Sequence, residues 1–359
     1  MFTFLNFFKK KWLLKKIEKT DLLIFSQDKF NFDRKINYAY FDRRKIYIRY
    51  IIKIIIFYIK QKIKGKSFSL ADSNTFIKMK KFDCNIALGH DRDESIFKFK
   101  DYFPEKKSIA YQFGYWFPNL AEKGFKIIKN RKADFYFLFD ERTKKLTEKY
   151  LKSNYIVSGS VSSNEIVLKK SDKNYDFMFI SNFRTPNSNK PDSLNNSQAF
   201  FLNLLSDYCA SNNKKYCIAR VSSRNDKLEY KTHLEKEENK FLKSNAVNYN
   251  LEDTNSFEVA EKSNVCICTH SNLGYQLLAR GHKVLFLNKE YDESSWHFMD
   301  VISGPFWYKG NNKVEIIKKI EFMSKVDNHL WKTVLNDSKV KMAFDPKNEI
   351  LKKLIHQLM

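Results

Sequence analysis

Short apolar runs alternate with longer polar or amphipathic segments along most of the chain. Runs of this length that are partly β-branched and are separated by helical segments are typical of the buried strands of a parallel sheet. The alternation therefore predicts an α/β protein with two successive sets of strands and helices. The expected strands lie at 21–26, 84–89, 108–114, 133–139 and 154–160, and then at 175–181, 215–221, 246–250, 264–269 and 283–288.

A chain of 359 residues is too long for one ordinary core and suits two domains. The polar stretch LKKSDKN predicts the linker between them. The end of the chain, from Asn328 to Met359, predicts helices divided near Pro346, and its last part is expected to cross back to the first domain. The expected divisions are 1–167, the linker 168–174, 175–335 and 336–359.

The stretch 265–288, VCICTHSNLGYQLLARGHKVLFLN, predicts a compact unit of a strand, a helix and a second strand. The first strand ends at Cys268, and Gly281 closes the helix. Ligands of open parallel sheets lie beyond the carboxyl ends of the strands. The residues expected at such an edge are Thr269, His270, Ser271 and Asn272.

The start of this helix suits a phosphate group, because helix N-termini carry unpaired amides and a partial positive charge. The donors expected there are the amides of Asn272, Leu273 and Gly274 and the hydroxyls of Thr269 and Ser271. The alternative is an ordinary helix cap, since Ser and Asn are favoured at that position. The local pattern does not decide between the two.

A second polar strand end, IALGHDRD, places His90, Asp91 and Asp93 together. An imidazole or carboxylate at this position can take a proton from an attacking hydroxyl, and two neighbouring acids raise one pKa. We expect Asp91 to be the general base, with His90 and Asp93 as its substitutes. The alternative is a solvated loop in which an aspartate caps a helix.

Other predicted strands also end in residues that suit a ligand. Gln112, Gly114 and Ser160 end strands of the first half, and glycine allows the backbone to approach a ligand closely. Arg184 and Arg220 follow strands of the second half, and their guanidinium groups suit diphosphate oxygens.

Two segments of the second half have alternative interpretations. The acids of LEKEENK (234–240) predict a solvated helix face, and the alternative is that Glu237 or Glu238 holds a ribose hydroxyl. The loop TPNSNKPDSLNNS (185–197) is rich in Pro, Asn and Ser, which suits a mobile lid over a cleft.

The formal net charge is +24, and over half of it lies in residues 1–66, which hold 18 Lys and Arg against 5 Asp and Glu. Such a charge is typical of nucleic-acid-binding proteins, but no usual binding module occurs, and the general abundance of Lys, Ile, Asn and Phe weakens that inference. The first 19 residues mix lysines with Phe, Trp and Leu. They predict either a segment at an anionic membrane surface or a solvated basic helix.

The run IYIRYIIKIIIFYIKQKIKGK (46–66) predicts an amphipathic helix. It is too often interrupted by charge to span a bilayer, and helical spacing places Arg49, Lys53 and Lys60 on one side. The helix either packs on the sheet or rests on lipid. No small-residue cleavage site follows the first apolar stretch, which disfavours a secretory signal.

The five cysteines are odd in number and include no CxxC pair, so neither disulfides nor a zinc site are expected. Cys266 and Cys268 lie in an apolar strand pattern, where buried thiols are common. A reducing cytoplasm fits this pattern best.

Five segments in order resemble a family of bacterial surface-carbohydrate biosynthesis proteins with the GT-B glycosyltransferase fold. THSNLGYQLLARGHKVLF and GPFWYKG are similar to the family's Leu-Gly-Tyr-Glu, Arg-Gly-Lys and Gly-x-Phe-Trp pieces. IALGHDRD, SIAYQFGYW and YIVSGSVSSNE resemble its strand ends. Gln276 stands where the family has a ribose-binding glutamate, and His270 replaces a smaller residue, so the donor or the rate would differ.

The resemblance implies two Rossmann-like α/β domains that face each other across a cleft. It implies transfer of a sugar or related unit from a nucleotide-sugar donor to a glycan or lipid-linked glycan, with no metal and no cofactor. Donor contacts would come from Arg184, Arg220, Thr269, Ser271, Asn272, Gly274 and Gln276, and acceptor contacts from Gln112, Gly114 and Ser160. The expected location is the cytoplasm, with peripheral contact to the inner, anionic membrane surface.

Two other classes of function stay open on the sequence. One is a non-catalytic nucleotide or glycan binder on the same scaffold. The other is a basic nucleic-acid-binding protein, whose affinity for generic DNA would depend strongly on salt.

Overall fold

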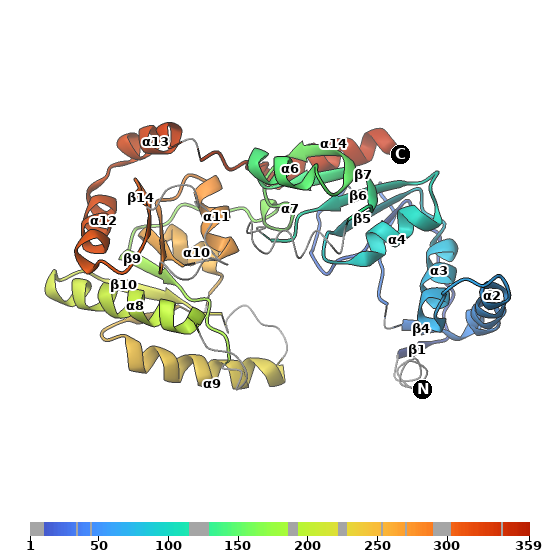
Figure 1. Ribbon diagram of the computed structural model, residues 1–359, viewed down its shortest axis with the longest axis horizontal. Helices are drawn as coiled ribbons and strands as arrows, with labels where there is room; N and C mark the ends of the chain where they lie inside the picture. Colours follow the sequence, from blue (N-terminus) through green and yellow to red (C-terminus); the bar gives the residue numbers. More distant parts are fainter. Residues whose placement is uncertain are drawn as a thin grey trace. The chain divides into compact units, whose positions relative to one another are not determined.

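The computed structural model describes residues 11–33, 35–43, 45–114, 129–185, 193–221, 228–252, 254–269, 271–289, 303–338 and 340–359. These residues form two compact units (Figure 1). Unit 1 holds the described residues up to Phe113, those of 129–165, and Asp345–Met359; unit 2 holds Gly114 and the described residues from Ile166 to Phe344. His270, the first ten residues and most of the predicted lid at 185–197 lie outside the described residues.

Unit 1 is built on a six-stranded parallel sheet with the order β3-β2-β5-β6-β7-β8. The chain runs from β2 outward to β3 and returns to β5 on the other side of β2, so the strand order reverses between β2 and β5. The strands are β2 (Leu22–Ile24), β3 (Tyr38–Tyr40), β5 (Ile86–His90), β6 (Lys107–Tyr111), β7 (Lys132–Leu138) and β8 (Lys152–Val157). A separate pair, β1 (Lys11–Leu13) and β4 (Lys45–Tyr47), forms a small parallel sheet.

Three helices of unit 1, α3, α4 and α6, begin at side-chain caps. Ser69 and Asp72 form a capping box at the start of α3, and Asp93 caps α4. The last helix, α14, places Leu351 and Ile355, four residues apart, in the core beside Ile24 and Ile86. The helices are η1 (Ile48–Tyr50), α2 (Ile51–Ile63), α3 (Leu70–Phe82), α4 (Glu94–Tyr102), α6 (Glu141–Thr147), α7 (Val161–Asn164), η4 (Pro346–Asn348) and α14 (Glu349–Leu358).

Unit 2 is built on a seven-stranded sheet with the order β11-β10-β9-β12-β13-β15-β14, in which the pairing of β14 with β15 is antiparallel and the other pairings are parallel. The order reverses between β9 and β12. The strands are β9 (Tyr175–Ile180), β10 (Tyr216–Ala219), β11 (Asn250–Glu252), β12 (Ser263–Cys268), β13 (Val284–Asn288), β14 (Ser303–Gly304) and β15 (Trp307–Lys309). The helices are α8 (Ser193–Ser211), α9 (Leu228–Asn245), α10 (Ser256–Glu261), α11 (Asn272–Ala279), α12 (Lys313–Lys325) and α13 (Asn328–Asp337).

The structure confirms the α/β fold class with two Rossmann-like units. The six-stranded sheet is parallel, the seven-stranded sheet is parallel apart from the β14–β15 pairing, and the strand order reverses at β2/β5 in the first and at β9/β12 in the second. The strand expected at 246–250 is misplaced, since β11 starts only at Asn250. Asn248 has a φ of 53°, a left-handed conformation that no strand continues through. The amphipathic helix expected within 46–66 is α2, and it packs against α3, with Phe57 stacked on Phe76 at 4.3 Å.

All five cysteines are free and buried, and for Cys266 and Cys268 the apolar strand pattern predicted this burial. Burial raises the pKa of the Cys268 thiol to about 12, so it stays protonated. Over the residues that the structure describes, no helix is both long enough and apolar enough to cross a bilayer.

Candidate functional site

The strand-order reversal of unit 2 lies where β9 and β12 end side by side, with Ile180 paired to Cys268. Thr269 follows β12 and is only 2% exposed, and its hydroxyl has no hydrogen-bond partner among the described residues. Ser271 caps α11 by accepting a hydrogen bond from the Leu273 amide at 3.3 Å. A buried hydroxyl without a partner is costly, so Thr269 is a natural point for a ligand to bind.

The prediction of free amides at the start of α11 is wrong for two of the three residues. The Leu273 amide donates to the Ser271 hydroxyl, and the Gly274 amide donates to the Ser271 carbonyl at 3.0 Å. Gly274 serves packing, because a Cβ there would lie 2.4 Å from the Cys268 sulfur and 3.1 Å from the Phe286 ring. Its small size lets α11 lie close against β12 and β13.

Arg220 lies at the end of β10 but is turned into unit 2 and is 4% exposed. Its guanidinium donates to Asn239 at 2.9 Å and forms an ion pair with Glu235 at 3.3 Å, both on α9. Part of its charge is therefore balanced within the protein, which lowers its value for a diphosphate.

Glu238 corrects the expectation of a solvated face for 234–240, because this side chain is fully buried. Its carboxylate accepts hydrogen bonds from the Ser181 hydroxyl at 2.6 Å and from the Val221 amide at 2.9 Å. It thereby joins the carboxyl ends of β9 and β10 to α9. Sequence analysis missed this role, since its partners lie 57 and 17 residues away.

Arg184 is exposed, and its backbone is fixed by Asn195 of α8. The Asn195 side chain accepts from the Arg184 amide at 3.1 Å and donates to the Arg184 carbonyl at 2.6 Å. Asn272 and Gln276 are both partly exposed and lie one turn apart on α11. The structure thus leaves Arg184, Asn272 and Gln276 accessible at the carboxyl ends of the unit 2 strands.

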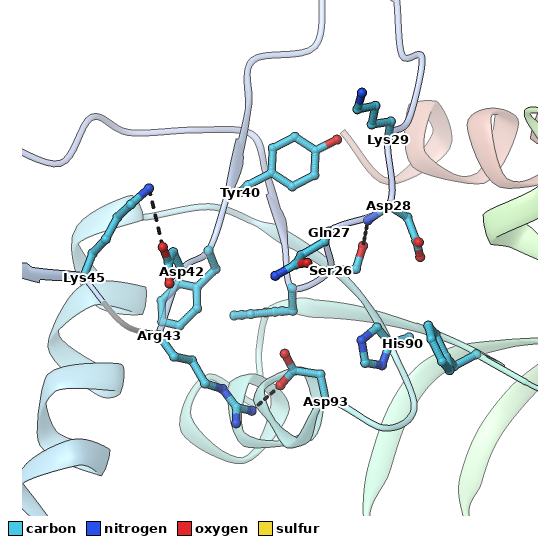
Figure 2. Close-up of a pocket in the computed structure, with 13 residues that line it drawn as sticks. Ser26, Gln27, Asp28, Lys29, Tyr40, Asp42, Arg43, Lys45, His90 and Asp93 are labelled. Carbon is cyan, nitrogen blue, oxygen red and sulfur yellow. Dashed lines mark hydrogen bonds and ion pairs between the residues drawn. The ribbon is translucent and has the colours of Figure 1, made fainter. Parts of the chain in front are cut away.

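Unit 1 has a cavity of about 720 Å³ at its own strand-order reversal, beyond the carboxyl ends of β2, β3 and β5 (Figure 2). This is where ligands of open parallel sheets bind. Its walls combine three carboxylates, three cationic side chains, one histidine and several aromatic rings. The lining residues are Phe25, Ser26, Gln27, Asp28, Lys29, Tyr40, Phe41, Asp42, Arg43, Lys45, His90, Asp93 and Phe113.

Two of the three predicted acid or base residues line this cavity, His90 and Asp93, and Asp91 does not. Asp91 is 4% exposed, and its two oxygens accept hydrogen bonds from the Tyr136 hydroxyl at 2.6 Å and the Phe113 amide at 3.1 Å. It holds the ends of three neighbouring strands together. The His90 ring lies 4.8 Å from the Phe113 ring, and its Nδ1 has no hydrogen-bond partner within the described residues.

The charged groups of the cavity are largely paired with one another. Arg43 forms an ion pair with Asp93, which also caps α4, and Lys45 lies 3.7 Å from Asp42. The Tyr111 hydroxyl donates a hydrogen bond to Asp28 of the cavity wall. Burial and the nearby Asp28 carboxylate together hold the Tyr111 pKa far above its usual value. A cavity with balanced charge, aromatic walls and carboxylate acceptors suits a neutral, hydroxyl-rich ligand better than a phosphate.

The predicted acceptor residues Gln112, Gly114 and Ser160 do not line this cavity. Gln112 is buried and accepts a hydrogen bond from the Phe139 amide at 2.9 Å, and Ser160 begins α7 with its carbonyl accepting from the Asn164 amide. Gly114 belongs to unit 2. Among the described residues, no three His, Cys, Asp or Glu side chains gather as metal ligands do.

Most of the cavity wall was missed by sequence analysis, especially Ser26–Lys29 and Tyr40–Arg43. A usable signal existed for the first group, because these polar residues directly follow the apolar run at 21–26. The second group follows β3, whose three residues alternate in exposure and are too few for a periodic pattern.

Solved structures similar to this chain include three at 8–10% sequence identity. One is the UDP-GlcNAc 2-epimerase from Methanocaldococcus jannaschii (TM-score 0.49, 8% identity, covering 94% of this chain and 99% of that one). The UDP-GlcNAc 2-epimerase from Neisseria meningitidis bound to UDP-GlcNAc has a TM-score of 0.44 and 10% sequence identity, and the match covers 88% of this chain and 98% of that one. MurG from Acinetobacter baumannii has a TM-score of 0.43 and 10% sequence identity, and the match covers 90% of this chain and 86% of that one.

No curated protein matches the sequence significantly. A family model described as "putative O-antigen biosynthesis protein" matches residues 119–359, which is more than half of the chain. This match confirms the resemblance to surface-carbohydrate biosynthesis proteins that the motifs indicated. The chain therefore belongs to this O-antigen biosynthesis family.

Proposed function

We propose that the protein is a glycosyltransferase that moves a sugar or related unit from a nucleotide-activated donor to a growing surface glycan. Family membership supports the glycan product. The observation that carries the proposal is that each unit has a polar edge at its strand-order reversal, and that the two edges differ in chemistry. One suits an anion and the other a hydroxyl-rich ligand with a base beside it.

We assign the donor nucleotide to the edge of unit 2. Thr269 would donate its unpaired hydroxyl to a phosphate oxygen, and Asn272 would meet the same group at the positive end of α11. Arg184 would balance the charge of the diphosphate from the end of β9, since its guanidinium is exposed. Gln276 would bond the ribose hydroxyls as a neutral amide.

We assign the acceptor to the cavity of unit 1 and the role of general base to His90. Asp91 is less suited to this role than the sequence indicates, because both of its oxygens already accept hydrogen bonds. The His90 imidazole would take the proton of the acceptor hydroxyl as that oxygen bonds to the anomeric carbon. The bond from that carbon to the diphosphate breaks, and the leaving charge is stabilised by Arg184 and the start of α11 without a metal.

The test is a screen of CMP-, CDP-, UDP- and GDP-activated sugars by thermal shift, followed by hydrolysis assays with the sugars that bind. A donor that is hydrolysed slowly by the wild type, and not by a His90→Asn variant that still binds it, supports the proposal. Nucleotide binding without turnover of any donor would instead favour a non-catalytic binder. Absence of any nucleotide binding would contradict the assignment of unit 2.

A further inference from the structure

Helix α2 carries a stripe of isoleucines that the protein leaves in contact with solvent. The stripe recurs at spacings of three and four residues, which places its members on one face of a helix. Their exposed fractions are 72% for Ile52, 44% for Ile55, 48% for Ile56, 49% for Ile59 and 80% for Ile63. Single exposed apolar residues are ordinary, but a contiguous stripe of five is typical of an interaction surface.

The opposite face of α2 fixes how this isoleucine stripe is presented. Ile54 is 1% exposed, and the Phe57 ring stacks on Phe76 of α3 at 4.3 Å and meets Phe68 at 5.6 Å. Figure 1 shows α2 beside α3 at the edge of unit 1. The helix is therefore held by one apolar face while the isoleucine stripe faces away from the unit.

Positive charges border the stripe on both sides, and residues 48–66 contain no Asp or Glu. On a helical projection Arg49, Lys53 and Lys60 follow one edge of the stripe, and Lys62 follows the other. An apolar stripe with cations along both of its edges is the pattern of a helix that lies in the interface of an anionic bilayer.

A cluster of lysines continues this charge from α2 onto the neighbouring elements. Lys16, Lys19, Lys53, Lys80 and Lys81 line a cavity of about 680 Å³, together with the acids Glu18 and Asp83. Asp83 pairs with Lys19 at 2.8 Å, but Lys53 lies close enough to Lys81 to lower the Lys81 pKa by repulsion. The excess positive charge here is complementary to lipid phosphates.

We infer that α2 lies flat on the surface of an anionic lipid bilayer, with the isoleucine stripe among the acyl chains and its lysines at the lipid phosphates. The helix has 13 residues and a length of about 20 Å, too short for the roughly 30 Å hydrocarbon core, so it rests on the bilayer. A second copy of the chain covering the stripe would bring two rows of lysines together, and the like charges disfavour that occupant.

The inference goes beyond the proposed function and is tested apart from it. Sedimentation with vesicles of phosphatidylcholine, or of phosphatidylcholine containing about one quarter phosphatidylglycerol, needs neither a nucleotide nor turnover. The wild-type protein is expected to bind the anionic vesicles and to release them as salt is raised. A lack of transferase activity would leave this result untouched.

Two variants of α2 separate the apolar and the charged contributions. Ile52→Ser, Ile56→Ser and Ile59→Ser combined should lower the partition coefficient by tenfold or more, because burial of apolar area is lost. Lys53→Gln with Lys60→Gln should lower it by roughly 25-fold, since each lysine near an anionic surface contributes about fivefold. All five replaced side chains are exposed to solvent, so both variants should keep the fold. Circular dichroism checks this.

The matched control removes exposed apolar side chains from unit 2. Val314 and Leu330 are 61% and 46% exposed, and a Val314→Ser, Leu330→Ser double variant should bind vesicles as the wild type does. The inference is overturned if the wild type ignores anionic vesicles at low salt, or if the triple isoleucine variant binds as well as the wild type. It is also overturned if sedimentation velocity shows a dimer that the triple variant abolishes.

Discussion

The two strand-order reversals described in this protein have the same topology, but one is lined by a cavity and the other is filled by buried side chains. In unit 1 the edge is hollow, and its cavity of about 720 Å³ is lined by three carboxylates, three cationic side chains and one histidine. In unit 2 the edge is largely filled by its own groups, because Glu238 and Arg220 are buried and bonded within the unit. The Thr269 hydroxyl there has no partner among the described residues, and Arg184, Asn272 and Gln276 are accessible.

This difference shows that topology decides where a ligand can bind and that side chains decide which ligand it is. Buried ion pairs and hydrogen bonds occupy charged groups that sequence analysis would assign to a substrate. Arg220 and Asp91 are both examples, since each follows a strand and each is committed to partners inside its own unit.

The largest expected effect separates His90 from Asp91 in unit 1. His90→Asn should lower turnover by about 10²–10⁴-fold, as loss of a general base does, with the affinity for the donor nucleotide unchanged. Asp91→Asn should instead lower the melting temperature, because it disturbs buried hydrogen bonds to Tyr136 and Phe113. Steady-state kinetics and thermal melts of both variants check this, and full activity of His90→Asn would refute the assignment.

The second prediction contrasts His90, at a cavity, with the buried His282 of unit 2. Burial and the cations Lys173 and Arg280 lower the His282 pKa from 6.5 to about 4, outweighing Glu261 at 3.3 Å. The unfolded chain therefore binds the extra proton between these two values, so stability should fall as the pH drops from about 6.5 to about 4. The loss from this group is on the order of 3 kcal/mol.

Chemical denaturation across this pH range measures the effect. A His282→Gln variant should lose the part of the pH dependence that this imidazole causes. An unchanged slope in the variant would show that other groups control the acid sensitivity.

The third prediction concerns packing at the unit 2 edge. Gly274→Ala should destabilise the protein by about 1–3 kcal/mol, because the new Cβ overlaps the Cys268 sulfur. Adding Cys268→Ala should recover part of this loss, which a double-mutant cycle measures by urea denaturation. If the effects of the two substitutions on the free energy of unfolding simply add, the destabilisation by Gly274→Ala does not arise from contact with the Cys268 sulfur.

The smallest expected effect is that of Thr269→Val, which should change nucleotide affinity but not stability. Thr269→Val keeps the shape of a side chain whose hydroxyl has no partner in the described structure, so stability should stay the same or rise slightly. If the hydroxyl meets a phosphate, nucleotide affinity should fall by about tenfold, the cost of one hydrogen bond to a charged group. Calorimetric titration of wild type and variant with the same nucleotide decides, and equal affinities would remove Thr269 from the site.

Much of the fold could be predicted from the sequence because its strands are local apolar runs. The run at 175–181 contains the buried strand β9, and the run at 84–89 overlaps β5, which ends one residue later at His90. The helix expected from Leu273 to Arg280 is α11, which starts and ends one residue earlier. Errors arose where a strand is very short or where backbone conformation ends it, as at β3 and at Asn248. Such features produce no periodic pattern for a sequence to reveal.

The sequence by itself determined the α/β class, the polar strand ends and an amphipathic stretch at 46–66, and it left the start of the helix after Ser271 open between a cap and a phosphate site. Tertiary structure decided which of these polar groups are available. It joined Asp91 to Tyr136, 45 residues away, and Ser181 to Glu238, 57 residues away, and it opened a cavity among Asp28, Arg43 and His90. The physical reason is that a hydrogen bond or an ion pair depends on distances that only packing sets, whereas an apolar period records the local backbone alone.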